Sequence, residues 1–271
     1  MAKYNKKRAR ELQHDKFRDT AGKIFDRVAD KLEGRGREIL YVLAGLVLVA
    51  ILAGVWLKWS NKKADEARLA LGRAITIATA PVASASPQPG EPAPTYNTEQ
   101  ERAQKAVEEF QKVAAKYGDP YKSEARYLMA TNMLYIDRDK ATVELAEVSK
   151  SSVPEVATLA KFALAQARES EGKNDDAAKL YSELAALNST IITPEIANLH
   201  LAEVNDKQGK RKEAVELLFT IAEASRKLKG TDGEPVPPTA AAREATEKLQ
   251  KLDPDRYAKL TPETPDTSSP F

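Results

Sequence analysis

The feature that most restricts how this chain can fold is an uncharged, strongly apolar segment near its N-terminus. Residues 39–57 (ILYVLAGLVLVAILAGVWL) carry no charged side chain, and 12 of these 19 residues are Leu, Ile or Val. A helix of this length spans about 28 Å, close to the hydrocarbon thickness of a bilayer. Its Leu, Ile and Val residues favour membrane insertion by on the order of 5 kcal/mol. We therefore expect a single transmembrane helix at 39–57, with a buried core helix as the alternative.

Aromatic residues flank this segment at both ends. Tyr41 lies near its start, and Trp56 and Trp59 lie near its end. Such side chains settle at the level of the lipid headgroups, so we expect these three to anchor the helix rather than to bind a ligand. Because 38 residues precede the segment and no small-x-small site follows it closely, we expect no cleavage and a retained anchor.

Residues 1–38 form a basic tail with 12 Lys+Arg against 7 Asp+Glu, whereas the rest of the chain carries 30 against 33. The twenty residues on either side of the apolar segment each carry five basic groups, so it is the further basic cluster at residues 3–10 that places the N-terminus in the cytoplasm and the C-terminal part across the membrane. Residues 17–32 show the apolar periodicity of an amphipathic helix, which suits an anionic lipid surface or the cytosolic loops of a partner protein. The interspersed acidic residues argue against nucleic-acid binding.

A repeated pattern begins at residue 99. Four segments, KAVEEFQKV, KATVELAEV, DAAKLYSEL and EAVELLFTI, align without gaps. Each has a small residue at its second position, at spacings of 35, 36 and 37, namely Ala106, Ala141, Ala177 and Ala214. The residue four further on is always large and apolar, namely Phe110, Leu145, Tyr181 and Leu218. This period is typical of stacked helical hairpins and predicts an all-α fold.

The residues between these segments indicate two helices in each repeat. Leu128, Leu164 and Leu201 lie thirteen residues before three of the alanines. Gly172 lies five residues before Ala177, and Gly209 lies five residues before Ala214. At this position a residue in the left-handed conformation would end the first helix. Pro120, Pro154 and Pro194 mark the starts of three first helices.

The remaining boundaries follow from composition. We expect a first repeat helix at 58–79, a proline-rich loop inserted at 80–98, and hairpin repeats over 99–252 that end in a capping helix from about Thr239. The proline-containing residues 253–271 are expected to be a disordered tail.

The leucine, alanine and large apolar residue at these offsets resemble the tetratricopeptide repeat. Asn132, Arg168 and Asn205 replace its usual tyrosine, and no tryptophan begins a first helix, so the repeats are divergent. A membrane anchor followed by AGVWLKWSNKKADEARLALGRAI and then by such repeats is similar to the YfgM-like proteins of the bacterial inner membrane. The resemblance covers roughly residues 17–225.

This resemblance implies an ancillary subunit of the Sec translocon, with periplasmic repeats that meet emerging polypeptides and periplasmic chaperones. It implies a single-pass protein of the inner membrane, with a cytoplasmic N-terminus. The longer basic tail, the proline insert and the extended C-terminus depart from the compact family pattern. A membrane-tethered scaffold for envelope assembly or export therefore stays as the alternative, in which the same groove holds one folded partner.

Stacked hairpins form a groove lined by their first helices, which suits a peptide or a partner helix. Helical position predicts that eight residues face this groove, with the protein core or an ordinary solvated face as the alternative for each: Arg126, Met133, Phe162, Gln166, Glu169, Leu199, Glu203 and Asp206.

The sequence offers little for catalysis or for cofactor binding. There is no cysteine, and the two histidines, His14 and His200, are expected on opposite sides of the membrane. We expect His200 to be an ordinary surface or packing residue. No glycine-rich phosphate loop is present, so we expect no catalytic residues, no cofactor and no metal site, and therefore a binding protein rather than an enzyme.

Overall fold

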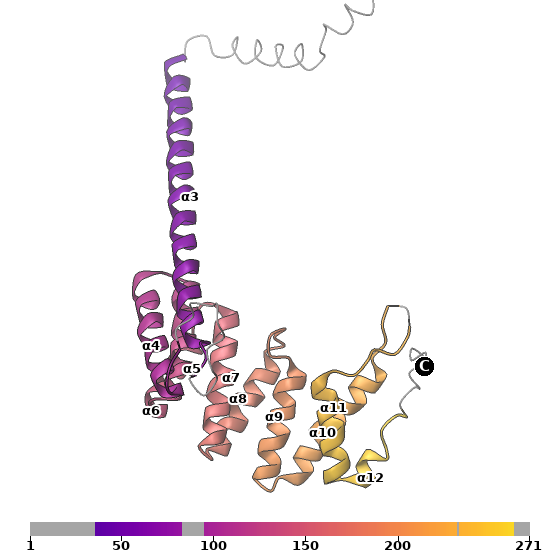
Figure 1. Ribbon diagram of the computed structural model, residues 1–271. Helices are drawn as coiled ribbons and strands as arrows, with labels where there is room; N and C mark the ends of the chain where they lie inside the picture. The colour runs from indigo at the N-terminus through magenta and orange to yellow at the C-terminus, as the bar shows by residue number, and fades with distance from the viewer. Residues whose placement is uncertain (1–35, 83–94, 232, 263–271) are drawn as a thin grey trace, which may run out of the picture. The chain divides into compact units, whose positions relative to one another are not determined.

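The computed structural model describes residues 36–82, 95–231 and 233–262 of the 271-residue chain, apart from the side chains of 36–44 and 56–57 (Figure 1). The chain divides into two units, Met1–Ala64 and Asp65–Phe271. The predicted amphipathic helix lies outside the described residues. Within the described ranges every regular element is a helix, and the β-type pairing consists of two isolated bridges. The prediction of an all-α chain is therefore confirmed for these ranges.

The first described element, α3 (Gly36–Ala78), is one continuous helix of 43 residues. It joins the apolar segment 39–57 directly to the expected first repeat helix at 58–79, because no proline interrupts this part of the sequence. Among the described residues, no helix is both long and apolar enough to cross a membrane. Part of the expected span lies outside the described side chains, at 39–44 and 56–57.

The other helices follow one another through short connections, and each packs against the next (Figure 1). Their bounds are α4 (Glu99–Lys116), α5 (Tyr121–Met133), α6 (Arg138–Val148), α7 (Pro154–Ser170), α8 (Asn174–Ala186), α9 (Pro194–Lys207), α10 (Arg211–Lys227), α11 (Ala240–Leu252) and α12 (Pro254–Tyr257). Pairs α5/α6, α7/α8 and α9/α10 are the hairpins that the repeat pattern predicts.

The ends of the helices follow the turn chemistry of the sequence. Gly172 and Gly209 have φ angles of +73° and +75°, and each terminates the first helix of its hairpin as expected. Pro154 and Pro194 are the first residues of α7 and α9, where the missing N–H breaks no helical hydrogen bond. Pro120 differs slightly, because it is the residue that precedes α5.

The repeat alanines lie in the interior of the helical stack. All four are fully buried: Ala106, Ala141, Ala177 and Ala214. The large residues four positions later are buried as well, none with more than 1% of its surface exposed: Phe110, Leu145, Tyr181 and Leu218. Each pair therefore supplies a small and a large surface to the interior of its hairpin, which is what the spacing predicted.

A larger side chain at a repeat alanine should disrupt this packing. Ala177→Leu is expected to lower the free energy of unfolding by about 1–3 kcal/mol, because Ala177 contacts the buried cluster around Ala165, Ala197 and Tyr181. The matched control is Ala186→Leu in the same helix, where the side chain is exposed and the change should stay within about 0.5 kcal/mol. Urea unfolding followed by circular dichroism measures both, and equal effects would contradict this packing.

The expected inserted loop joins the two helices of the first hairpin. Most of it, residues 83–94, lies outside the described residues. Its two ends lie together, because the Tyr96 N–H donates to the Pro81 carbonyl at 3.2 Å and Val82 forms an isolated bridge with Tyr96. Helix α3 can therefore pack against α4, with Leu71 in contact with the cluster around Phe110.

The chain after α11 differs from the expectation of a disordered tail at 253–271. Pro254 begins the short helix α12, and Leu260 is buried with 6% of its surface exposed. The Glu223 carboxylate of α10 accepts hydrogen bonds from the Thr261 N–H at 2.9 Å and from its hydroxyl at 2.7 Å. The prediction is therefore wrong up to residue 262, because the prolines start a helix rather than prevent one; 263–271 lies outside the described residues.

Candidate functional site

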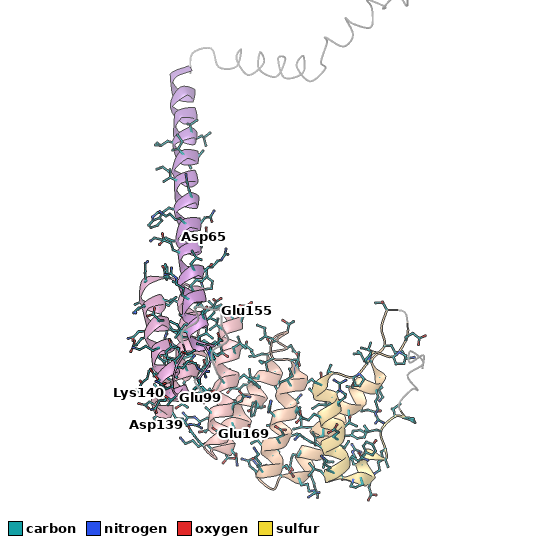
Figure 2. All side chains as sticks on the ribbon, in the orientation of Figure 1. Asp65, Glu99, Asp139, Lys140, Glu155 and Glu169 are labelled. Atoms are coloured by element: carbon teal, nitrogen blue, oxygen red, sulfur yellow. The ribbon has the colours of Figure 1, made fainter. Side chains whose placement is uncertain are left out.

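The first helices of successive hairpins lie beside one another as a row, which we call the first-helix row: α5, α7, α9 and α11. Helix α5 packs beside α7, and α9 packs beside α11. Between α7 and α9, the rings of Phe162 and His200 lie 5.2 Å apart, and Lys207 pairs with Glu169 at 2.6 Å. Glu155 and Glu169 mark the two ends of α7 in Figure 2. All eight predicted groove residues belong to this row.

The predicted residues on α5 and α7 differ in how freely they present their side chains. Arg126 is half-buried, and its Nε donates to Glu144 of α6 at 2.6 Å, so its guanidinium is already engaged within the hairpin. Met133 is half-buried. Gln166 is exposed, and it is the predicted residue on α7 that is most open to a partner.

The prediction for Leu199 is wrong, because this side chain lies in the core. Only 4% of its surface is exposed, and it belongs to the buried cluster that includes Leu218 of α10 and Ala245 of α11. The capping helix α11 contributes to this cluster, so Leu199 cannot contact a partner without unfolding of the end of the stack.

Three aromatic rings from consecutive helices form a cluster beneath the first-helix row. Tyr181 of α8 is fully buried, and its ring stacks on that of His200 at 5.2 Å with an angle of 15° between the planes. Phe162 meets Tyr181 edge-on at 6.0 Å. His200 therefore has the packing role that the sequence suggested. Sequence reasoning did not select Tyr181 for the site, although its place four residues after Ala177 had marked it as buried.

Two carboxylates on the row are held in place by this cluster and by lysines. Glu169 accepts a hydrogen bond from the Tyr181 hydroxyl at 2.9 Å and pairs with Lys207 at 2.6 Å. Glu203 contacts His200 Nδ1 at 3.1 Å and pairs with Lys248 of α11 at 2.9 Å. Polar contacts therefore join α7 to α9 and α9 to α11, and they fix both predicted groove residues in defined positions.

These contacts alter the proton affinities of the groups involved. The pKa of Glu203 falls to about 2, chiefly because of its hydrogen bond with His200 and then because of the Lys248 ammonium, while burial opposes the shift. Burial raises the pKa of Tyr181, and the hydrogen bond to Glu169 raises it further. Glu203 is therefore ionised and Tyr181 neutral at every pH in which the protein is expected to work.

The depressed pKa of Glu203 predicts an acid-dependent loss of stability. The pKa lies below its ordinary value of 4.5, so the stabilisation is complete above about pH 4.5 and is lost as the pH falls toward 2. Glu203→Gln should therefore lose less stability than the wild type between pH 5 and pH 3, by on the order of 2 kcal/mol. Urea unfolding at both values measures this. The exposed Glu247→Gln is the control, and equal pH slopes for all three proteins would contradict the assignment.

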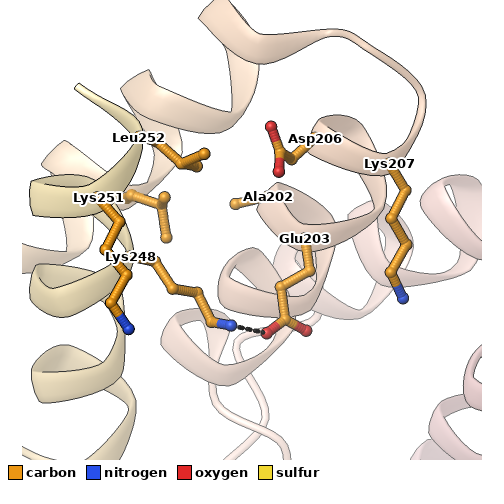
Figure 3. Close-up of a pocket in the computed structure, with 8 residues that line it drawn as sticks. Ala202, Glu203, Asp206, Lys207, Lys248, Lys251 and Leu252 are labelled. Atoms are coloured by element: carbon orange, nitrogen blue, oxygen red, sulfur yellow. Dashed lines mark ion pairs between the residues drawn. The ribbon is translucent and has the colours of Figure 1, made fainter.

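A pocket of about 370 Å³ opens between α9, α10 and α11 at the end of the row (Figure 3). Its floor is apolar and consists of Ala202, Leu218 and Leu252. Charged side chains surround this floor: Glu203, Asp206, Lys207, Lys248 and Lys251. Two predicted groove residues, Glu203 and Asp206, thus line this pocket, which the sequence could not show because three of its eight lining residues come from α11.

Other kinds of site receive no support within the described ranges. No group of three or more His, Cys, Asp or Glu side chains there could hold a metal ion. The chain contains no cysteine. His200, the histidine on the row, is committed to the ring cluster and to Glu203.

The predicted membrane-flanking residues are described only in part. The side chains of Tyr41 and Trp56 lie outside the described residues. Trp59 exposes 56% of its surface, and the Lys63 ammonium lies 3.6 Å from the centre of its ring. Every side chain in the intervening segment 45–55 is exposed.

Comparison with solved structures adds a likeness in fold. No family model matches the chain, and no curated protein matches it. The fold is similar to a crystal structure of nearly identical TPR-like repeats from Podosopora anserina, assigned to a kinesin light chain, with a TM-score of 0.45 and 18% identity over 56% of this chain and 77% of that chain. The assignment of tetratricopeptide-like hairpins therefore rests on the buried repeat alanines and on the turns described above.

Proposed function

We propose that this chain is a membrane-anchored protein-binding module without catalytic activity. In this proposal its first-helix row holds segments of polypeptide that emerge from the Sec translocon of a bacterial inner membrane. The observation that carries the proposal is the first-helix row itself, where exposed Gln166 on α7 and the pocket at α9 and α11 offer polar, charged and apolar contacts.

Rigid presentation of this surface supports a binding role. Glu169 is held by contacts from α8 and α9, and Glu203 is held by His200 of its own helix and by Lys248 of α11, so both lose little side-chain entropy when a polypeptide binds. Helical-hairpin repeats have extended surfaces that suit protein partners rather than small substrates. The acid–base groups that line the pocket are carboxylates and lysines, and three of them, Glu203, Lys207 and Lys248, are held in ion pairs, which favours a binding role over catalysis.

Exposure of the apolar part of α3 supports membrane anchoring. Leu46, Val49 and Val55 expose 61–63% of their surfaces, although such residues normally avoid water. Within about two helical turns after Val55 come three lysines, Lys58, Lys62 and Lys63, whose ammonium groups can reach lipid headgroups. The resemblance to YfgM-like proteins adds the translocon, the inner membrane and the periplasmic side to this proposal.

Direct binding to an unfolded protein tests the core of the proposal. The full-length protein in mild detergent should bind reduced, carboxymethylated α-lactalbumin, which cannot fold, and it should bind the native form far more weakly. Fluorescence anisotropy of the labelled client measures both affinities. Equal affinity for the two forms, or no binding of either, would contradict a role in holding emerging polypeptides.

Purification from membranes tests the translocon assignment. The intact protein from mildly solubilised membranes should bring down translocon channel subunits, as identified by mass spectrometry. A control chain in which an unrelated anchor replaces residues 1–57 should lose them. Recovery of one envelope complex with both chains, and no channel subunit, would instead favour a membrane-tethered scaffold.

A further inference from the structure

We propose that the pocket between α9 and α11 receives the long basic side chain of an arginine or lysine in the bound polypeptide. This inference rests on the proposed protein-binding function and names the type of residue that the first-helix row selects. Three features carry it: an apolar floor, a carboxylate at the mouth with no partner, and the engagement of two of the three lining lysines in ion pairs.

The floor suits the aliphatic stem of such a side chain. Ala202 and Leu218 close the bottom of the pocket, with 1% of each exposed, so the apolar surface open to a stem is chiefly that of Leu252, which is half-buried. The volume of about 370 Å³ leaves room for one long side chain. Basic side chains bury their methylene groups on apolar surfaces while they keep the charged head at the rim.

Asp206 supplies an acceptor for the charged head. Its side chain is exposed, lines the pocket beside Leu252, and makes no hydrogen bond or ion pair with any residue that the structure describes (Figure 3). A carboxylate without a partner at the edge of an apolar floor is complementary to a guanidinium or ammonium group. The planar guanidinium can bind both of its oxygens at once.

The lysines of the pocket wall do not make it an anion site. Lys248 is paired with Glu203 at 2.9 Å and with Glu244 at 3.3 Å, and Lys207 is paired with Glu169 at 2.6 Å. An incoming carboxylate would have to displace one of these partners. Lys251 remains, and Figure 3 shows its side chain directed away from Asp206.

Peptides that differ at one residue test this inference. Three short labelled peptides of alanine, serine and leucine carry arginine, citrulline or glutamate at one central position. Citrulline keeps the stem and the planar head of arginine but lacks the charge. The full-length protein in detergent should bind the arginine peptide about tenfold more tightly than the citrulline peptide, because a charge-assisted hydrogen bond is lost. The glutamate peptide should bind most weakly.

Two matched variants assign the preference to the pocket. Asp206→Asn should abolish the discrimination between arginine and citrulline, whereas Lys251→Gln should preserve it. Discrimination that survives in Asp206→Asn, a preference for glutamate, or equal binding of all three peptides would overturn the inference. If carboxymethylated α-lactalbumin still binds in those cases, the proposed function stands without the basic subsite; if neither it nor any peptide binds, the proposed function itself fails.

Discussion

Replacing Leu48 and Leu52 of α3 with arginine should release the protein from the membrane fraction into the soluble fraction. Near the centre of a bilayer, each exchange of leucine for arginine costs about 3 kcal/mol. Two exchanges therefore disfavour insertion by about 6 kcal/mol, or more than about ten-thousandfold. Both leucines are exposed, at 58% and 59%, so the substitutions leave the packing of the repeats unchanged. Alkaline extraction of cell membranes, followed by immunoblotting of the pellet and the supernatant, measures this change.

The matched control places the same two charges on exposed apolar positions elsewhere. Leu69 and Val143 expose 65% and 64% of their surfaces, and their replacement with arginine should leave the protein in the pellet. If the Leu48 and Leu52 variant stayed in the pellet, or if the wild type were already soluble, anchoring by this segment would be refuted.

Tyr181→Ala should be the most destabilising single substitution in the repeats, with a loss of about 3–5 kcal/mol in the free energy of unfolding. The tyrosine is fully buried, and it contacts the rings of Phe162 and His200. Its removal leaves a cavity where three helices meet, and Glu169 loses one of its two partners. Urea unfolding at neutral pH measures the loss.

Two further variants separate ring packing from the hydrogen bond. Tyr181→Phe keeps the ring and should cost only about 1 kcal/mol, because Glu169 stays paired with Lys207. Tyr135→Ala removes a tyrosine that is 57% exposed, and its effect should be within about 0.5 kcal/mol. A loss for Tyr181→Ala no greater than for Tyr135→Ala would show that the cluster does not hold these helices together.

The hairpins were predictable because alanine recurs at a nearly constant spacing. Such a recurrence indicates a position where the two helices of each hairpin pack against each other. Ala106 and Ala177 are fully buried, and a larger side chain at either position would overpack the interior. The glycines with positive φ, at 172 and 209, were predictable for a similar reason, since few other residues adopt that conformation.

The binding face was less predictable, since equivalent repeat positions need not have equivalent surroundings. Phe162 and Leu199 occupy the same position in consecutive repeats, yet Phe162 is half-buried whereas Leu199 is covered by the cluster to which α11 contributes. The connection 228–239 interrupts the period, so the sequence did not indicate which α11 side chains would meet α9. The pocket and the pair between Glu203 and Lys248 depend on that placement.

Photocrosslinking from the first-helix row tests the central claim most directly. A benzoylphenylalanine at Gln166 of α7 replaces an exposed side chain on the row, and one at Lys179 of α8 replaces an exposed side chain on the second helix of the same hairpin. In living cells, the probe at Gln166 should crosslink to many polypeptides, and the probe at Lys179 should crosslink to few. Equal crosslinking from the two positions, or none from Gln166, would contradict the conclusion that the first helices form the protein-binding face.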